Sequence, residues 1–191
     1  DNASGDIDWE RRMYEVGHIT TDNKRTTLRS LFSLQGEFAN DWQWDASISY
    51  GKSHQNQLRS NEIDVVKERQ ALDAEYAADG VTIQCADPDA RAAGCVPLNV
   101  FGVGSITPEM ADWIRVNPTI DSTVEQTQAL AYVSGDMFDM PAGSVPMVFG
   151  VEYRKDAIDL QTDEGSQYGG ITFNLIPSFE ADYDVWEAFT E

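Results

Sequence analysis

The stretch Thr26–Ser53, TTLRSLFSLQGEFANDWQWDASISYGKS, decides the fold because apolar and polar side chains alternate through most of it. Only Leu31 interrupts the pattern, and the alternation restarts after Ala39-Asn40-Asp41. The apolar members are Leu28, Phe32, Leu34 and Phe38, then Trp42, Trp44, Ala46, Ile48 and Tyr50. Side chains along a strand point to opposite faces in turn, so this spacing predicts two long strands joined by a tight turn.

A second hairpin is predicted further along the chain. Gln126–Phe138 is its first strand, 139–144 its turn, and Val145–Arg154 its alternating second strand, in which Pro146 removes one donor from the ladder. Shorter alternating runs at Arg12–Val16 and Tyr183–Phe189 bring the expected number to about six strands, the last one cut by the end of the chain. The predicted fold class is all-β, mainly an antiparallel meander.

The connection between the hairpins, residues 53–125, is expected to be a long structured loop. It holds a weak helical spacing at Glu62–Ala78 and a helix start at Thr107-Pro108-Glu109, where a hydroxyl cap precedes a first-turn proline. Cys85 and Cys95 lie close together without a nearby histidine, so we expect a disulfide rather than a metal site, and with it an oxidising compartment.

Loop lengths distinguish two architectures. Tight turns at one end of the strands and a very long connection at the other are typical of transmembrane β-barrels, whose strands need about 9 to 11 residues to cross the hydrocarbon. Trp42 and Trp44 flank a short turn, while Tyr50 and Tyr153 sit near the far strand ends, as aromatic rings at two membrane interfaces would. The alternative is a soluble β-sandwich, in which the same apolar face packs on a second sheet.

The charge excludes several classes of protein. The 191 residues include 13 Lys+Arg and 33 Asp+Glu, a net charge of 13 − 33 = −20. Such a chain would repel nucleic acid and anionic lipid, whereas its 41% hydrophobic content is too high for a disordered acidic tail. It has neither a basic-then-apolar leader nor a long apolar run. From Asp156 to Glu191 it carries 9 acidic residues and no Lys or Arg, which we assign to a polar loop and a polar sheet face.

No sequence motif for catalysis is found, so we expect no enzyme, catalytic residue, cofactor or bound metal. Gly102-Val103-Gly104 lacks the third glycine of a dinucleotide fingerprint, and His18 and His54 have no adjacent ligand partner. Asp79 with Asp87-Pro88-Asp89 has oxygen ligands suited to calcium, but this spacing is more typical of turns. Trp113 is either a substrate platform or, as we favour, the anchor of its short helix.

Six segments of the chain share a pattern with a known family. They are DWQWD at 41–45, CVPLNVFG at 95–102, GSITPE at 104–109, VSGDMFDMPAG at 133–143, FGVEYR at 149–154 and VWEAFTE at 185–191. Together and in this order they resemble the middle of the barrel of TonB-dependent outer-membrane receptors. The resemblance implies that residues 1–191 are part of a barrel of 22 strands in the outer membrane of a Gram-negative bacterium. The plug domain and the C-terminal strands are not recognised.

The resemblance also implies function and partners. Such a receptor binds a nutrient such as an iron chelate, vitamin or saccharide at its outer loops, and a TonB-type energy-transducing complex acts through the plug. In a barrel, the polar positions expected to face the lumen are Arg29, Gln35, Glu37, Asp45, Glu152 and Arg154. The positions expected to face lipid are Leu28, Phe32, Trp42, Trp44, Ile48, Tyr50, Phe149, Val151 and Tyr153.

Two alternatives remain beside the receptor. A secreted β-sandwich would bind a carbohydrate or protein ligand through the long loop, and an esterase-like or glycosidase-like enzyme has only scattered carboxylates in its favour. An incomplete barrel has open strand edges and a lipid face without lipid, so we expect the isolated chain to self-associate.

Overall fold

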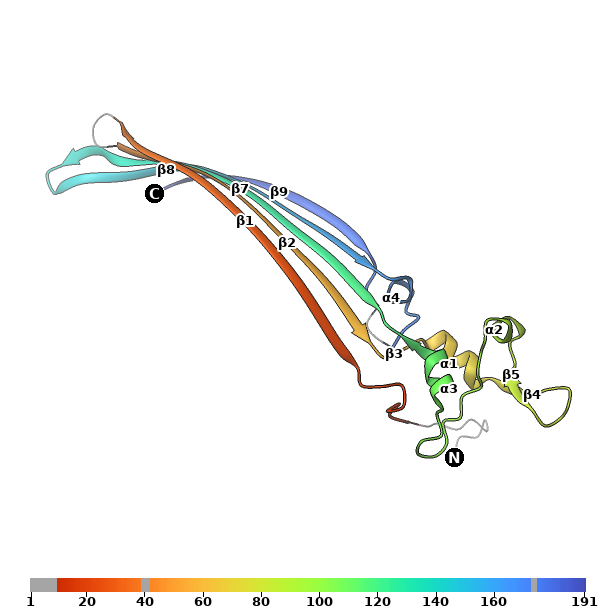
Figure 1. The fold of residues 1–191 in the computed structure, drawn as a ribbon. Helices are drawn as coiled ribbons and strands as arrows, with labels where there is room; N and C mark the ends of the chain where they lie inside the picture. Colours follow the sequence, from red (N-terminus) through yellow and green to blue (C-terminus); the bar gives the residue numbers. More distant parts are fainter. Residues whose placement is uncertain (1–9, 39–41, 173–174) are drawn as a thin grey trace, which may run out of the picture. The chain divides into compact units, whose positions relative to one another are not determined.

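The described part of the protein is mainly antiparallel β-structure, with 59% of its residues in strands and 14% in helices. The computed structural model describes residues 10–38, 42–172 and 175–191. Five long strands form one sheet in the order β1-β2-β7-β8-β9, and Figure 1 shows them side by side. Their bounds are β1 Thr20–Phe38, β2 Trp42–Ser60, β7 Thr119–Met140, β8 Gly143–Thr162 and β9 Phe179–Thr190. Within the described ranges, no helix is long and apolar enough to cross a membrane.

Both predicted hairpins are present, and their strands are longer than the alternation indicated. β1 and β2 have 19 residues each, and β7 and β8 have 22 and 20. The predicted turn at 39–41 lies outside the described residues, whereas β7 and β8 are joined at Pro141-Ala142. β9 pairs antiparallel with β8, from Leu160 opposite Phe179 to Phe149 opposite Thr190.

Pro146 lies inside β8 without disturbing it. The amide of Val148 donates to Glu191 at 2.9 Å, so this side of β8 points towards β9. The nitrogen of Pro146, two residues earlier, faces the same side, and the proline removes one donor at this position.

The expected strand at Arg12–Val16 is wrong, and the main sheet has five strands rather than about six. Residues 14–16 form a turn, in which the amide of Val16 donates to Met13 and that of Gly17 to Tyr14. Gly17 has φ +120°, a conformation that favours glycine. Val16 is only 1% exposed. Burial of its side chain in a core, and not hydrogen bonding to a neighbouring strand, therefore holds this segment in place.

The chain forms two compact units. The strand unit contains 23–56, 120–161 and 178–191, and the loop unit contains Gln57–Thr119 with the segments up to Asp22 and from Thr162 to Pro177. Helices and short strands of the loop unit are β3 Glu62–Ile63, α1 Val65–Leu72, β4 Ala74–Tyr76, β5 Ile83–Cys85, α2 Pro88–Ala92, α3 Pro108–Ile114, β6 Arg115–Val116 and α4 Glu164–Tyr168. The expected loop at 53–125 is thus shorter at both ends, because β2 continues to Ser60 and β7 begins at Thr119.

A small apolar core holds the loop unit together. Its buried members come from segments far apart in the sequence: Val16, Ala71, Leu98, Val100, Ile106, Ala111 and Ile114. β3 and β6 pair beside it, with Ile63 opposite Arg115, and the amide of Asp64 donates to Ile114 at 2.8 Å. Burial of these side chains supplies the stabilisation that helices of five to eight residues lack on their own.

The helix starts follow the predicted capping chemistry. Thr107 is the N-cap of α3 and Pro108 its first residue. The Trp113 indole donates to the Lys67 carbonyl at 3.1 Å, and the Lys67 ammonium lies 5.2 Å from the ring centre, which are contacts of an anchor between α3 and α1. The helix expected within 62–78 covers only Val65–Leu72, since Ala74–Tyr76 pairs with β5 instead.

The predicted disulfide between Cys85 and Cys95 is confirmed, with the two Cα atoms 6.3 Å apart. Arg91 reinforces the same loop by donating to the carbonyls of Cys85 and Ala86 at 2.6 and 2.9 Å. Asp87 caps α2 and also accepts from Gln70 at 3.1 Å. The disulfide and these hydrogen bonds therefore both stabilise the loop between Cys85 and Cys95.

Candidate functional site: the two faces of the sheet

Side-chain contacts fix which residues share a face of the strand unit. On β1 and β2, odd-numbered residues meet, as in the Arg25–Gln55 contact, and even-numbered residues meet, as in Phe38–Trp42. The pairs Thr27–Ser53 and Gly36–Trp44 fit the same register, so no bulge interrupts it. Trp42 of β2 contacts Gly135 of β7 and stacks on Phe149 of β8. The even positions of β2 therefore share a face with the odd positions of β7 and β8.

The face with the even positions of β1 and β2 and the odd positions of β7 and β8 carries aromatic contacts across strands, and we call it the aromatic face. Trp42 stacks with Phe38 and Phe149 at ring-centre distances of 6.3 and 6.4 Å. Towards the other strand end, Tyr153 and Trp186 lie 4.6 Å apart. The alternation within β8 and β9 did not reveal this second contact, because it depends on the register that places Tyr153 opposite Trp186.

All nine positions expected to face lipid lie on this aromatic face. They are Leu28, Phe32, Trp42, Trp44, Ile48, Tyr50, Phe149, Val151 and Tyr153. Several are widely exposed, among them Phe32 at 62% and Leu28 at 57%, and Trp186 is exposed at 73%. We call the part from Leu28 and Tyr50 to the short turns the apolar band.

The same face becomes charged beyond the apolar band. Lys52 pairs with Glu125 at 2.7 Å and Lys155 with Asp182 at 3.2 Å. His54 lies 3.1 Å from the Thr123 hydroxyl. Sequence reasoning placed the acidic residues near the C-terminal end on a loop and the polar face, but the register puts Asp182 and Asp184 opposite Ala157 and Lys155, on the aromatic face. They lie outside the band, on the side away from the short turns.

The opposite face is the more polar of the two, although exposed apolar side chains such as Leu31, Phe138 and Phe179 also lie on it. Gln128 donates to Glu152 at 2.9 Å, Gln126 donates to Asp156 at 2.7 Å, and Arg154 lies 3.5 Å from Asp156. The six positions expected to face a lumen share this face: Arg29, Gln35, Glu37, Asp45, Glu152 and Arg154. Phe189 is another apolar residue on this face, covering Gly150, where an added Cβ would lie 2.1 Å from the ring.

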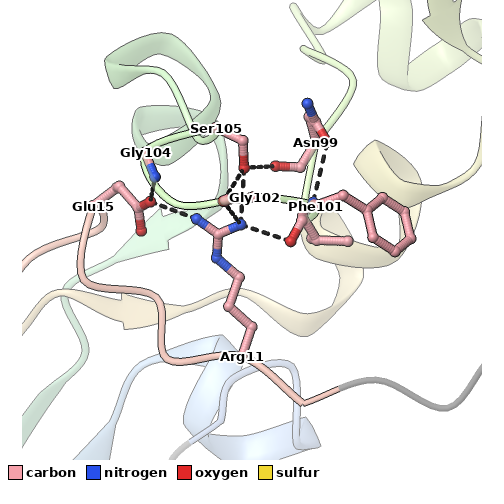
Figure 2. A network of polar contacts seen from close by, with 8 residues as sticks. Arg11, Glu15, Asn99, Phe101, Gly102, Gly104 and Ser105 are labelled. Atoms are coloured by element: carbon pink, nitrogen blue, oxygen red, sulfur yellow. Dashed lines mark hydrogen bonds and ion pairs between the residues drawn. The ribbon is translucent and has the colours of Figure 1, made fainter.

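A polar network in the loop unit holds the loop 99–105, and Figure 2 shows it. The Arg11 guanidinium donates to the carbonyls of Val100 and Gly102 at 2.6 and 2.9 Å and to the Ser105 hydroxyl at 2.8 Å, and it pairs with Glu15. Glu15 accepts from its own backbone amide, from Arg11 and from the Gly104 amide, which together hold the pKa of its carboxyl below the ordinary value. No sequence motif indicated this network, because Arg11 and its acceptors are about ninety positions apart.

The remaining candidate residues have local structural roles. Asp79 accepts from the amides of Val81 and Thr82 at 3.0 and 2.9 Å, and Asp87 caps α2. The backbone carbonyl of His18 accepts from the side-chain Nδ2 of Asn61 at 2.7 Å. Among the described residues, no group of three His, Cys, Asp or Glu side chains could hold a metal ion.

Comparisons with known proteins identify no relative: no family model matches the chain, and no curated protein matches it.

Proposed function

We propose that this chain is part of the barrel of a TonB-dependent receptor in the outer membrane of a Gram-negative bacterium. One observation carries the proposal. A single sheet presents an exposed apolar band on one face and a more polar surface on the other, and the band gives way to charges in the direction of the long loops. A lipid bilayer can surround such a band, because paired strands satisfy each other's backbone hydrogen bonds and leave only apolar side chains facing the lipid.

The length of the band supports a bilayer as its surroundings. Leu28 to Phe38 spans ten steps of about 3.3 Å, or roughly 33 Å along β1. A strand tilted by about 40° would then span about 25 Å along the membrane normal, the height of the apolar band of outer-membrane barrels. Aromatic side chains lie near both limits: Trp42 and Phe38 at the short turn, and Tyr50 at the charged end.

The single layer of the sheet favours the receptor over a soluble sandwich. A sandwich needs a second sheet against the apolar face. Apart from the five-stranded sheet, the described strands form only two pairs, each with strands of two or three residues. Neither is large enough to cover Phe32, which is 62% exposed, together with the rest of the band.

The proposed activity is uptake by binding and gating, without covalent chemistry on the solute. The loop unit, connected to the charged ends of the long strands, would form part of the outer vestibule that receives an iron chelate, vitamin or saccharide. Opening would depend on a plug domain and a TonB-type energy-transducing complex. The expected partners are therefore lipid, a small nutrient and that complex, and nucleic acid is not among them.

The receptor proposal makes a direct prediction about the gene. Its reading frame should extend by several hundred residues on both sides of this segment, with a plug domain upstream. Sequencing the complete reading frame tests this. A stop codon close to Glu191 together with a start close to Asp1 would contradict the receptor and favour the sandwich.

Quenching by lipid tests the apolar band itself. With the chain reconstituted into vesicles of phosphatidylcholine brominated on its acyl chains, we expect strong quenching of Trp42 and Trp44, because bromine lies in the hydrocarbon region. W42F/W44F should remove about half or more of the brominated-lipid quenching, because these two tryptophans belong to the apolar band that we expect to contact lipid.

W113F is the matched control for this experiment. Trp113 packs between α1 and α3 of the loop unit, so its replacement should leave the lipid-dependent quenching unchanged. Equal losses in W42F/W44F and W113F, or no quenching of the unmodified chain, would contradict a lipid-facing band.

A further inference from the structure

The polar face of the strand unit contains a region without acidic side chains. It covers the odd positions of β1 from 23 to 33, the odd positions of β2 from 47 to 55, and the even positions of β7 from 120 to 130. Its only charged residues are Arg25 and Arg29. These three runs together contain seventeen positions. In a chain with 33 acidic residues among 191, seventeen positions would be expected to include about three acidic residues, so the composition of this region differs from that of the whole chain.

Neither arginine is neutralised within the described part of the chain. Arg25 donates through Nε to the Gln55 side-chain oxygen at 3.1 Å, and that amide donates onward to Asn23 at 3.1 Å. The side chain of Arg29 makes no hydrogen bond or ion pair to any described residue. The β1–β2 register places it opposite Gly51, which has no side chain to meet it.

Most other cationic positions of the strand unit have an acidic partner. Three of the four, Lys52, Lys155 and Arg154, each have a carboxylate within 4 Å, and the fourth, Lys24, lies on the opposite face. Around Arg25 and Arg29 the polar neighbours are hydroxyls and amides, such as Thr27, Ser53 and Gln55, which donate to an anion without neutralising the guanidinium, and Leu31 is an apolar neighbour on the same strand.

We propose that the face around Arg25 and Arg29 binds a small solute through its carboxylate or phosphate groups. This inference rests on the proposed function, because a solute would meet this face while passing through the barrel, and it narrows the transported class to anions. Guanidinium groups hold such oxygens with charge-assisted, often paired hydrogen bonds. Lipid headgroups are the less suitable occupant, because these arginines point away from the face that carries the apolar band.

Citrate is a suitable probe, since it is small and carries three carboxylates. The full chain is prepared in uncharged detergent micelles, and the arginine Nε–H signals are followed by NMR during titration with citrate. We expect two arginine signals to shift together and to saturate, and the affinity to fall as salt rises. R25Q/R29Q should weaken citrate binding by about tenfold, which corresponds to about 1.4 kcal/mol.

Two variants separate a site from bulk charge. K24Q removes a positive charge from the neighbouring position of β1 on the opposite face, so it should change citrate affinity by less than about twofold. R25K/R29K keeps both charges but loses the planar guanidinium, so its affinity should fall between those of the wild-type chain and R25Q/R29Q. Circular dichroism of each variant verifies that the strand content is unchanged.

Several outcomes would overturn this inference. They are equal citrate affinity in R25Q/R29Q and the wild-type chain, an equal loss in K24Q, or binding to anionic vesicles without binding to citrate. Failure of the anion site is distinguishable from failure of the receptor proposal. Brominated-lipid quenching of Trp42 and Trp44 should persist in R25Q/R29Q, and its absence from the wild-type chain would contradict only the membrane assignment.

Discussion

Arg11 illustrates how a single residue holds a loop that has little regular structure. Its guanidinium satisfies two backbone carbonyls and a hydroxyl of the loop 99–105, and its side chain is only 13% exposed. Replacing it with methionine removes the donor to the Val100 carbonyl, whereas the Gly102 carbonyl still accepts from the Ser105 hydroxyl. We expect R11M to lower the free energy of opening of this loop by about 2 kcal/mol. Amide hydrogen exchange at 100–105 measures the change.

Arg12 provides the control at the same scale. It is exposed and makes no contact of this kind with the described residues, so R12M should shift the opening free energy by less than about 0.5 kcal/mol. Similar effects of R11M and R12M would show that loss of a positive charge, and not loss of the network, destabilises the loop.

At the scale of elements, Asp79 fixes the turn between β4 and β5. Its carboxylate accepts from the Thr82 hydroxyl and from the amides of Val81 and Thr82, which together lower its pKa from 3.8 to about 2. A lowered pKa means that the carboxylate stabilises the hairpin above pH 3.8, and that this contribution is lost as the pH falls through about 2. We expect the Thr82 amide NMR shift to titrate with a midpoint near pH 2 and to lose this transition in D79N; a midpoint near 3.8 would contradict the hydrogen-bonded turn.

The same scale separates what the sequence predicts from what it cannot. Alternation along Leu28–Phe38 and Trp42–Tyr50 predicts both strands and their faces, because a long strand with one apolar face has a regular period. The Thr107-Pro108 pair predicts the start of α3 for an equally local reason. The turn at Tyr14–Val16 is not predictable in this way, since the burial of Val16 depends on residues about a hundred positions away.

Some features of the candidate site are predictable from the sequence and others are not. The nine apolar positions follow from the period of the strands, but the pairing of Tyr153 with Trp186 and of Lys52 with Glu125 follows from registers between strands. Arg25 and Arg29 are ordinary polar positions in the sequence. Their distinct environment emerges only when three strands are placed side by side and the acidic residues fall elsewhere.

For the whole molecule, the apolar band and the net charge of −20 act in opposite directions on association. Burying a large exposed side chain such as Phe32 or Leu28 contributes about 1.5 to 3 kcal/mol, whereas like charges repel over a Debye length of about 10 Å at 0.1 M salt. Without detergent, we expect the isolated chain to self-associate at low micromolar concentration and to do so more strongly as salt rises. Size-exclusion chromatography with light scattering measures both effects, and micelles should restore the monomer.

The variant F32S/F149S tests which surface is responsible. Both rings lie on the aromatic face, Phe32 on the edge strand β1 and Phe149 on β8, so polar replacements should reduce association if copies bury the apolar band against each other. Association that persists unchanged in F32S/F149S would instead indicate pairing of the outer strand edges, whose backbone groups the substitutions leave intact. A monomeric wild-type chain at low micromolar concentration without detergent would contradict both routes, because it would require the band to remain in water at no measurable cost.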